Sequence, residues 1–192
     1  WVGVNDGFLT ATEVTDVTSL TWSNPSSAQG IGYFPNLEHI CCQTGTLTQL
    51  NVSSFPNLQN LFCDENQLTS LNVSSNHALV KLQCYNNNIK SLNVGSNPNL
   101  ELLICVNNPL GKLDVSRNTQ LQVLRCGSDD LSELNVSNNT LLTEFECWSN
   151  HLTELDLSKN KALTRVLLGV QELNGLRINK TPEGYTFNLK DY

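Results

Sequence analysis

The apolar positions of this chain repeat with a period of 21 residues. Several columns of like residues keep this period in one common register, which chance does not explain. One column is six cysteines, Cys42, Cys63, Cys84, Cys105, Cys126 and Cys147. Further columns are Leu47, Leu68, Ile89, Leu110, Leu131 and Leu152, then Leu50, Leu71, Leu92, Leu113, Leu134 and Leu155, then Val52, Val73, Val94, Val115, Val136 and Leu157. A fixed period of this length predicts stacked units that share one core.

Each unit fits the template L-x-x-L-x-L-x-x-N/C-x-L of leucine-rich repeats, with Cys in the third apolar slot. In the segment Asn60–Asp64, strand alternation sends Leu61 and Cys63 inward and Phe62 outward. Stacking in register then gives a parallel sheet. We predict a mainly β repeat solenoid, a leucine-rich-repeat right-handed superhelix with the parallel sheet on its concave face.

The asparagines follow the same period in two further columns. Their amides suit the bends, where inward side chains can pair backbone groups that the sheet leaves unpaired. The columns are Asn66, Asn87, Asn108 and Asn150, interrupted by Asp129, and Asn76, Asn97, Asn118, Asn139 and Asn160.

The 21-residue unit with its cysteine column resembles the repeats of bacterial internalin J-type proteins and of related surface proteins of Bacteroidetes. The resemblance covers about residues 17–179 and rests on the period together with the cysteine ladder. It implies an exported, cell-surface or periplasmic protein that contacts other proteins.

Both ends depart from the repeat and predict caps. Residues 1–36 form an N-terminal cap, with a short helix from about Thr10 in the capping box Thr10-x-x-Glu13, then a degenerate first repeat with Trp22 near the cysteine slot. Residues 37–165 are the regular repeats. Residues 166–192 form a degenerate last repeat and a β cap, in which Tyr185, Phe187 and Leu189 alternate as one further strand.

The outward positions of the predicted strands carry the strongest functional signal. Leu102, Ile104, Val106 and Val123 fall on neighbouring strands as one apolar patch, and large exposed apolar patches mark contact sites. Cross-strand pairs should join Arg125 to Glu146 and Glu144 to Arg165. The alternatives are ordinary strand composition and packing against another segment. The predicted binding residues are Phe62, Tyr85, Leu102, Ile104, Val106, Val123, Arg125, Glu146 and Trp148.

Catalytic chemistry has little support. The ladder cysteines are expected to be reduced core residues, because neighbouring parallel strands would have to distort to bridge them. Cys41 lies outside the ladder, two residues from His39, which is the beginning of a nucleophilic dyad without an orienting third group. No other catalytic motif is present, so we expect a protein that is not an enzyme.

No metal or cofactor is expected. Residues 2–13 resemble an EF-hand or dockerin-like calcium loop, with Asp6 and Glu13 at the fifth and twelfth positions. Val2 and Val4 stand where oxygen ligands are required, which favours a vestigial loop that starts the cap helix.

The charge narrows the class of partner. A formal net charge of -7 disfavours nucleic acid and anionic lipid, and no apolar run is long enough to insert in a membrane. A chain that begins at Trp1 and contains no Met is expected to be a trimmed piece whose signal or anchor is absent. We therefore expect a secreted or cell-surface bacterial monomer that recognises a protein, on a host or another cell surface, through its concave sheet. The alternative is a structural spacer or stalk without a ligand.

Overall fold

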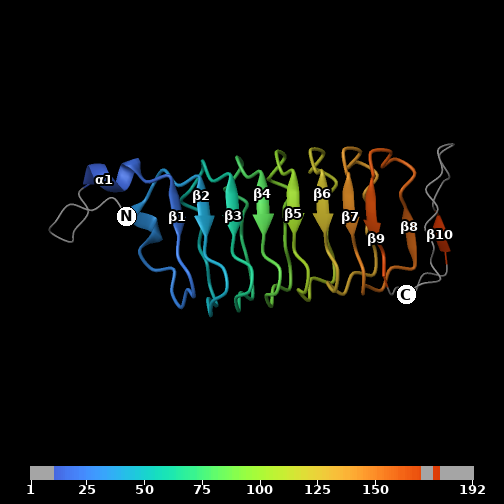
Figure 1. The fold of residues 1–192 in the computed structure, drawn as a ribbon, viewed down its shortest axis with the longest axis horizontal. Helices are drawn as coiled ribbons and strands as arrows, with labels where there is room; N and C mark the ends of the chain where they lie inside the picture. The colour runs from blue at the N-terminus through green and yellow to red at the C-terminus, as the bar shows by residue number, and fades with distance from the viewer. Residues whose placement is uncertain (1–10, 170–174, 178–192) are drawn as a thin grey trace.

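The computed structural model describes residues 11–169 and 175–177 as a short helix followed by a stack of strands (Figure 1). The helical elements are α1 (Ala11–Asp16) and the 3-10 turn η1 (Ile31–Tyr33). The strands are β1 (Ser19–Thr21), β2 (His39–Cys41), β3 (Asn60–Phe62), β4 (Lys81–Gln83), β5 (Leu102–Ile104), β6 (Val123–Arg125), β7 (Glu144–Glu146), β8 (Glu154–Asp156), β9 (Arg165–Leu167) and β10 (Gly175–Arg177).

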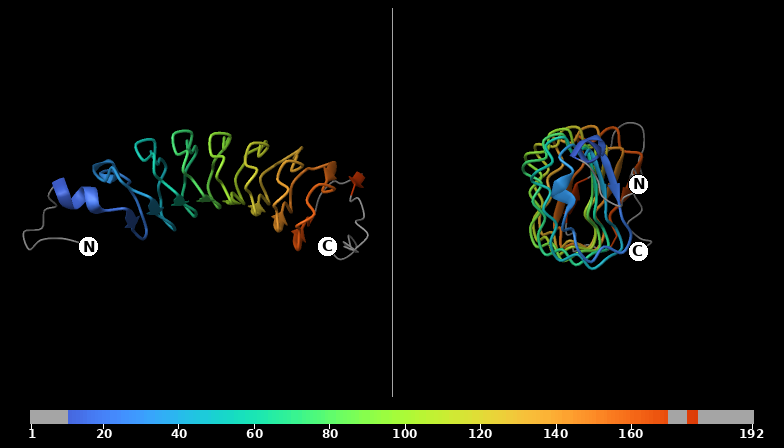
Figure 2. Two further views of the ribbon diagram at one scale, coloured as in Figure 1. Left: turned by 90° about the horizontal axis from the view of Figure 1, so that it is seen from above. Right: turned by 90° about the vertical axis from the view of Figure 1, so that its left-hand side faces the viewer.

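Eight of these strands form one parallel sheet in the order β1-β2-β3-β4-β5-β6-β7-β9. From β2 onward each residue faces the one 21 positions later, as in the pair Leu61 and Leu82. The stack is curved, and the sheet lies along the inner side of the curve (Figure 2). The predicted leucine-rich-repeat solenoid with a parallel concave sheet is confirmed, and β1 of the degenerate first repeat adds one strand to it.

The apolar columns fill the interior behind this sheet. Each strand from β2 to β7 buries its central residue at 0% exposure, as Leu61, Leu82 and Leu103 show, and the six ladder cysteines are equally buried. Phe55 and Phe145 replace smaller residues in single layers and are also enclosed. Since each layer covers the next, the described repeats share one continuous core.

The asparagine columns pair the backbone at the bends, as predicted. In the first column Asn87 donates from Nδ2 to the carbonyls of Cys63 and Cys84 at 3.1 and 3.0 Å, and its Oδ1 accepts from Leu68 N at 2.9 Å. In the second column Asn97 Nδ2 donates to the carbonyls of Val73 and Asn76 at 3.0 and 2.8 Å. Each side chain thus ties its own repeat to the preceding one, and a buried amide left without such a partner would be costly.

The structure describes only part of each predicted cap. Within the predicted N-terminal cap, the helix α1 covers Ala11–Asp16. Trp22 follows β1 and packs, half-buried, against the core. The alternating strand predicted at Tyr185, Phe187 and Leu189 lies outside the described residues.

A second, two-stranded sheet was not predicted. β8 and β10 pair in parallel, with Leu155 opposite Leu176, on the return segment of the repeat and away from the main sheet. Among the described residues, the equivalent segments of earlier repeats form no strand.

We expect the ladder thiols to be unreactive in the folded protein. All seven cysteines are free, and burial raises the pKa of Cys42 and Cys147 to about 12. A thiol reagent should modify only half-buried Cys41 before denaturation and the ladder afterwards. Intact mass measured with and without reductant checks the redox state, because each disulfide would remove a pair of hydrogens. Several such bridges would contradict the packing described above.

Asp129 occupies the asparagine column in repeat six and changes its hydrogen bonding. It is fully buried, accepts from Asn108 N at 2.9 Å through Oδ1, and accepts from Cys105 Sγ at 3.3 Å through Oδ2. Burial raises the pKa of this carboxyl from 3.8 to about 7, although the bonds from Asn108 and Cys105 oppose the shift. The neighbouring Asp130 adds to it.

This raised pKa predicts that stability falls as the pH rises. Between pH 4 and pH 7 the folded chain holds a proton on Asp129 that the unfolded chain has lost, so the free energy of unfolding decreases across this window and levels off above it. Asp129→Asn should remove that slope and raise stability at pH 8 by about 1 to 4 kcal/mol. Urea denaturation at pH 5 and pH 8 measures both effects. Asp114→Asn, at an exposed carboxylate, is the control, and an unchanged slope in Asp129→Asn would contradict the assignment.

Candidate functional site

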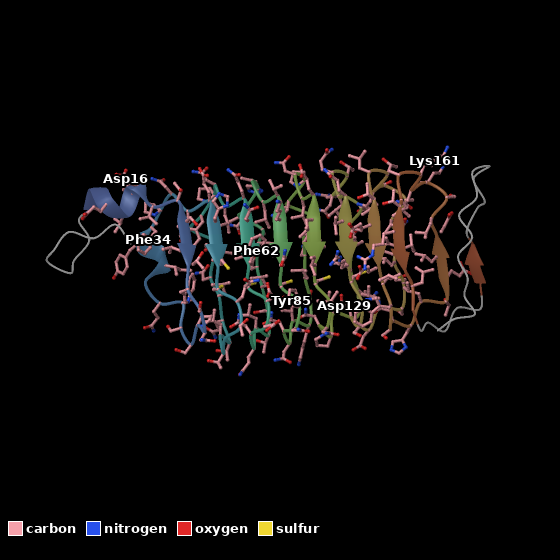
Figure 3. The ribbon with its side chains drawn as sticks, viewed as in Figure 1. Asp16, Phe34, Phe62, Tyr85, Asp129 and Lys161 are labelled. Atoms are coloured by element: carbon pink, nitrogen blue, oxygen red, sulfur yellow. The ribbon has the colours of Figure 1, made fainter. Side chains whose placement is uncertain are left out.

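The concave sheet presents a continuous apolar centre. The register places Leu102 beside Val123 and Ile104 beside Arg125, while Val106 follows β5 on the same face. All four apolar side chains of the predicted patch are half-buried, so each keeps part of its surface exposed. Phe62 on β3 and Tyr85 after β4 flank the patch (Figure 3). The sequence thus located these side chains correctly; that they bind a partner is a proposal taken up below.

Gly127, which follows β6, leaves room for the Trp148 indole, and this ring extends the apolar surface. A Cβ at Gly127 would lie 2.5 and 2.6 Å from the indole atoms Cε2 and Cδ2. The Trp148 ring therefore covers the backbone of the neighbouring repeat, and Gly127 is buried beneath it. Val106 precedes Gly127 by one repeat, so the apolar surface runs along one row from Tyr85 through Val106 to Trp148.

On the β3 side of the patch, the buried carboxylate of Asp64 lies beside Tyr85. Asp64 is 1% exposed although it stands on the concave face, and Gln43 Nε2 donates to both its oxygens at 2.7 and 2.9 Å. Burial, followed by a hydrogen bond to Asp64, raises the pKa of Tyr85 to about 12. Sequence reasoning overlooked this cluster, although the adjacency of Gln43, Asp64 and Tyr85 in one row could have indicated it.

Two arginines and two glutamates on β6, β7 and β9 border the patch. The predicted pairs are present, with Arg125 Nε 3.3 Å from Glu146 Oε1 and Arg165 Nη1 3.4 Å from Glu144 Oε2. The diagonal pairs are shorter, at 2.9 Å from Arg125 Nη2 to Glu144 Oε2 and 2.6 Å from Arg165 Nη1 to Glu146 Oε1. We call these four residues the Arg–Glu tetrad.

Charge proximity rather than aligned hydrogen bonding holds Glu146 within the tetrad. Its Oε1 lacks a well-directed hydrogen bond, and its side chain is only 9% exposed. The Glu144 carboxylate accepts a hydrogen bond from Arg125, and this bond, with a further contribution from Arg165, holds its pKa below the usual range. The tetrad carries no net charge.

The Cys41 and His39 pair does not form a dyad. Cys41 Sγ donates to Gln43 Oε1 at 3.2 Å, while His39 Nδ1 lies 2.6 Å from Asn60 Nδ2. Burial and then the Asp64 charge raise the pKa of the Cys41 thiol, whereas a nucleophilic cysteine requires a lowered one. The calcium-loop resemblance at residues 2–13 falls mainly on residues outside the described ranges. Within the described ranges, no group of three or more His, Cys, Asp or Glu could hold a metal ion.

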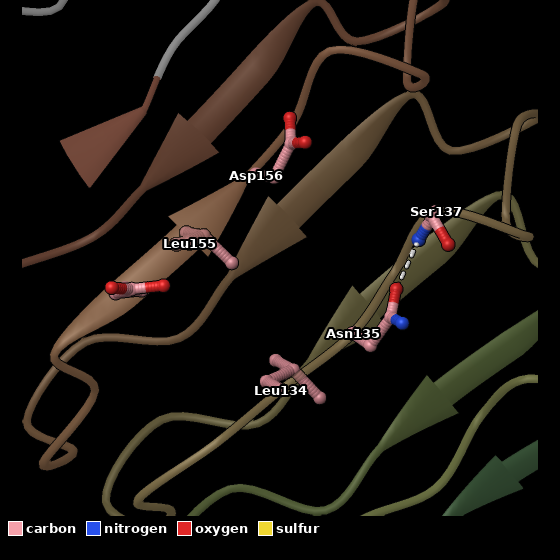
Figure 4. Close-up of a pocket in the computed structure, with 6 residues that line it drawn as sticks. Leu134, Asn135, Ser137, Leu155 and Asp156 are labelled. Atoms are coloured by element: carbon pink, nitrogen blue, oxygen red, sulfur yellow. Dashed lines mark hydrogen bonds between the residues drawn. The ribbon is translucent and has the colours of Figure 1, made fainter. Parts of the chain in front are cut away.

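A hollow of about 350 Å³ lies on the return side of the solenoid, between repeat six and β8 (Figure 4). Leu134 and Leu155 form its floor, and Asn135 accepts a hydrogen bond from Ser137 N at 2.9 Å on its rim. It is open and mostly polar, so we do not assign it a ligand. Of the helices in the described segments, none has the length and hydropathy that spanning a membrane demands.

Comparison with solved structures agrees with this geometry. The functional domain of internalin J from Listeria monocytogenes, which includes a cysteine ladder, superposes with a TM-score of 0.61 at 26% identity. The fold is that of a bacterial leucine-rich-repeat protein with a cysteine ladder. The match covers 88% of this chain and 48% of that one. No family model matches the sequence, and no curated protein matches it.

Two further structures share the fold at lower identity. Internalin F from Listeria monocytogenes has a TM-score of 0.66 at 16% identity, over 89% of this chain and 64% of that one. A leucine-rich-repeat protein from Leptospira interrogans has a TM-score of 0.67 at 18% identity, over 86% and 53%. The chain thus spans about half to two thirds of the length of these leucine-rich-repeat proteins.

The burial of the tetrad predicts unequal effects of its two carboxylates on stability. Glu146→Gln leaves two guanidinium groups beside one carboxylate in a buried position. It should lower the free energy of unfolding by about 1 to 3 kcal/mol. Glu144→Gln, at a side chain 34% exposed, should cost about 1 kcal/mol or less. Urea denaturation of both variants tests this difference. Equal losses of stability would show that solvent screens the ion pairs of the two glutamates to the same extent.

Proposed function

We propose that this chain is a protein-recognition module of a secreted or surface-displayed bacterial protein, and that it binds its partner on the concave sheet. The observation that carries the proposal is the apolar and aromatic row from Tyr85 through Val106 to Trp148, with Leu102, Ile104 and Val123 beside it. These side chains gain free energy only if a partner removes them from water. Similarity to the internalins supports the location and the class of function.

The size of the face suits such a role. Eight strands at a spacing of ~4.8 Å give a sheet roughly 30 Å across, which is enough for a standard protein interface. Aromatic side chains at the centre of such surfaces are typical anchors, since they bury large areas at small entropic cost.

The charges favour binding driven by apolar contact. The outward columns contain three basic and three acidic residues against a net charge of -7 for the chain. Five of these six have partners within the chain, four in the tetrad and Asp64 with Gln43. A partner with a neutral apolar contact surface therefore fits this face best.

Ile104→Glu tests the proposal. A carboxylate at the centre of the patch should weaken binding about thirtyfold or more without unfolding the chain, because the side chain points away from the core. Trp148→Ala should do likewise. The measurement is affinity for a partner recovered with the wild-type protein by pull-down and then purified.

Two controls complete the design. Leu141→Glu changes an apolar side chain that is 46% exposed outside the concave columns and should bind like wild type. Leu103→Glu places a charge in the core and should unfold the chain. If Ile104→Glu and Trp148→Ala both retain wild-type affinity, the concave patch is not the site, and a spacer role becomes the better account.

A further inference from the structure

The indole of Trp148 is held flat on the sheet by Gly127. Among the atoms that a Cβ at position 127 would meet, the nearest are Cε2 and Cδ2, followed by Nε1 at 2.9 Å. Cε2 and Cδ2 are the two carbons at the ring fusion, which the outer ring atoms shield from any approach within the ring plane. They can be nearest only to a point above the plane, so one face of the indole lies on the Gly127 backbone.

The other face of the indole is then directed away from the sheet, into the concave side. Trp148 keeps part of its surface exposed, in agreement with this orientation. On the opposite flank, a Cβ at Gly169 would collide with the Trp148 Cβ, so glycine is required on both neighbouring repeats. The two glycines thus fix the ring as a platform, and half-buried Trp148 keeps part of its surface accessible.

Directed polar groups stand next to this platform. Arg125 is the last residue of β6 and precedes Gly127 by two positions, and Glu146 is the last residue of β7 and precedes Trp148 by two positions. Arg125 and Glu144 are each 34% exposed and Arg165 is 47% exposed, so guanidinium donors and a carboxylate acceptor reach solvent. Their mutual contacts hold these groups in place before any ligand arrives.

We propose that Trp148, Arg125 and Glu144 form a saccharide subsite at the β6–β7 part of the concave sheet. The C–H bonds on one face of a neutral pyranose ring are slightly positive and are attracted to the negative face of an indole. The hydroxyl groups of the ring can accept from the guanidinium groups and donate to the carboxylate. An aromatic platform with a few placed polar groups is the composition of a small-ligand site.

A neutral sugar fits this place better than a charged ligand or a peptide. The tetrad has no net charge, so an anion or cation would have to displace one of its members. A proline or aromatic ring would stack on the indole, but it has no hydroxyl groups that could bond to the exposed guanidinium and carboxylate groups of Arg125 and Glu144. A pyranose can place its C–H face on the indole while its hydroxyl groups bond to Arg125 and Glu144. The subsite shares Trp148 with the proposed protein interface, whereas Ile104 belongs to that interface alone.

Saturation-transfer NMR with defined sugars tests the inference. The probes are the methyl β-pyranosides of glucose, galactose, mannose and N-acetylglucosamine, with methyl glucuronide as the charged control. At least one neutral pyranoside should bind wild type at roughly 1 to 10 mM, as expected for so small a ligand. Transfer should be strongest to the protons of one ring face, and glucuronide should bind less well.

Three variants separate the subsite from the rest of the sheet. Trp148→Ala removes the platform, and Gly127→Ala keeps the tryptophan but forces its ring off the backbone, so each should weaken binding by about tenfold or more. Ile104→Glu should bind the sugar like wild type, because it changes only the aliphatic patch. Circular dichroism verifies that every variant is folded.

Two results would overturn the inference. One is an absence of transfer to every neutral pyranoside, or transfer that Trp148→Ala leaves unchanged. The other is binding of acetyl-triproline amide where the sugars do not bind, which would assign the platform to a peptide. Loss of protein-partner affinity in Ile104→Glu alone leaves the subsite unaffected, so the two proposals fail separately.

Discussion

Hydrogen bonding between neighbouring repeats in a fixed register is the constraint on which the rest of this structure depends. Strands pair at intervals of 21 residues, and the asparagine amides reach carbonyls 21 or 24 positions earlier. One inserted residue would misalign both sets of bonds at once, and a one-residue shift would also turn every strand side chain to the opposite face. The length of the unit, its apolar columns and the position of each concave side chain all follow from that register.

For this reason the sequence predicted much of the fold and of the surface. Once the cysteine column is recognised, the neighbour of any strand residue is found by adding 21, which is how Arg125 was paired with Glu146 and Glu144 with Arg165. Alternation supplied the side of the sheet, so the apolar patch could be located before any coordinates were considered. The diagonal pairs of the tetrad are a matter of side-chain conformation, which periodicity does not specify.

Other features depend on packing or on backbone geometry that sequence patterns do not encode. Thr44 and Glu65 adopt left-handed backbone conformations, with φ of 55° and 54°, that their side chains disfavour. The bend imposes this conformation at the same position in successive repeats, whatever residue is present. Likewise, periodicity places Gly127 in a surface row but does not show that the indole of Trp148, from the next repeat, covers it. Asp64 is buried because Gln43 and Tyr85 enclose it, although alternation alone would leave it in water.

The small sheet of β8 and β10 has a consequence for the shape of the molecule. The arc exists because hydrogen bonds keep the strands of the main sheet closely spaced while the return segments, which are not paired, are farther apart, so each repeat acts as a wedge. Between β8 and β10 the return side is paired too, and both edges of the wedge then have the same thickness. Pairing on the return side therefore opposes bending at this joint, and we expect the arc to be less curved there than between earlier repeats.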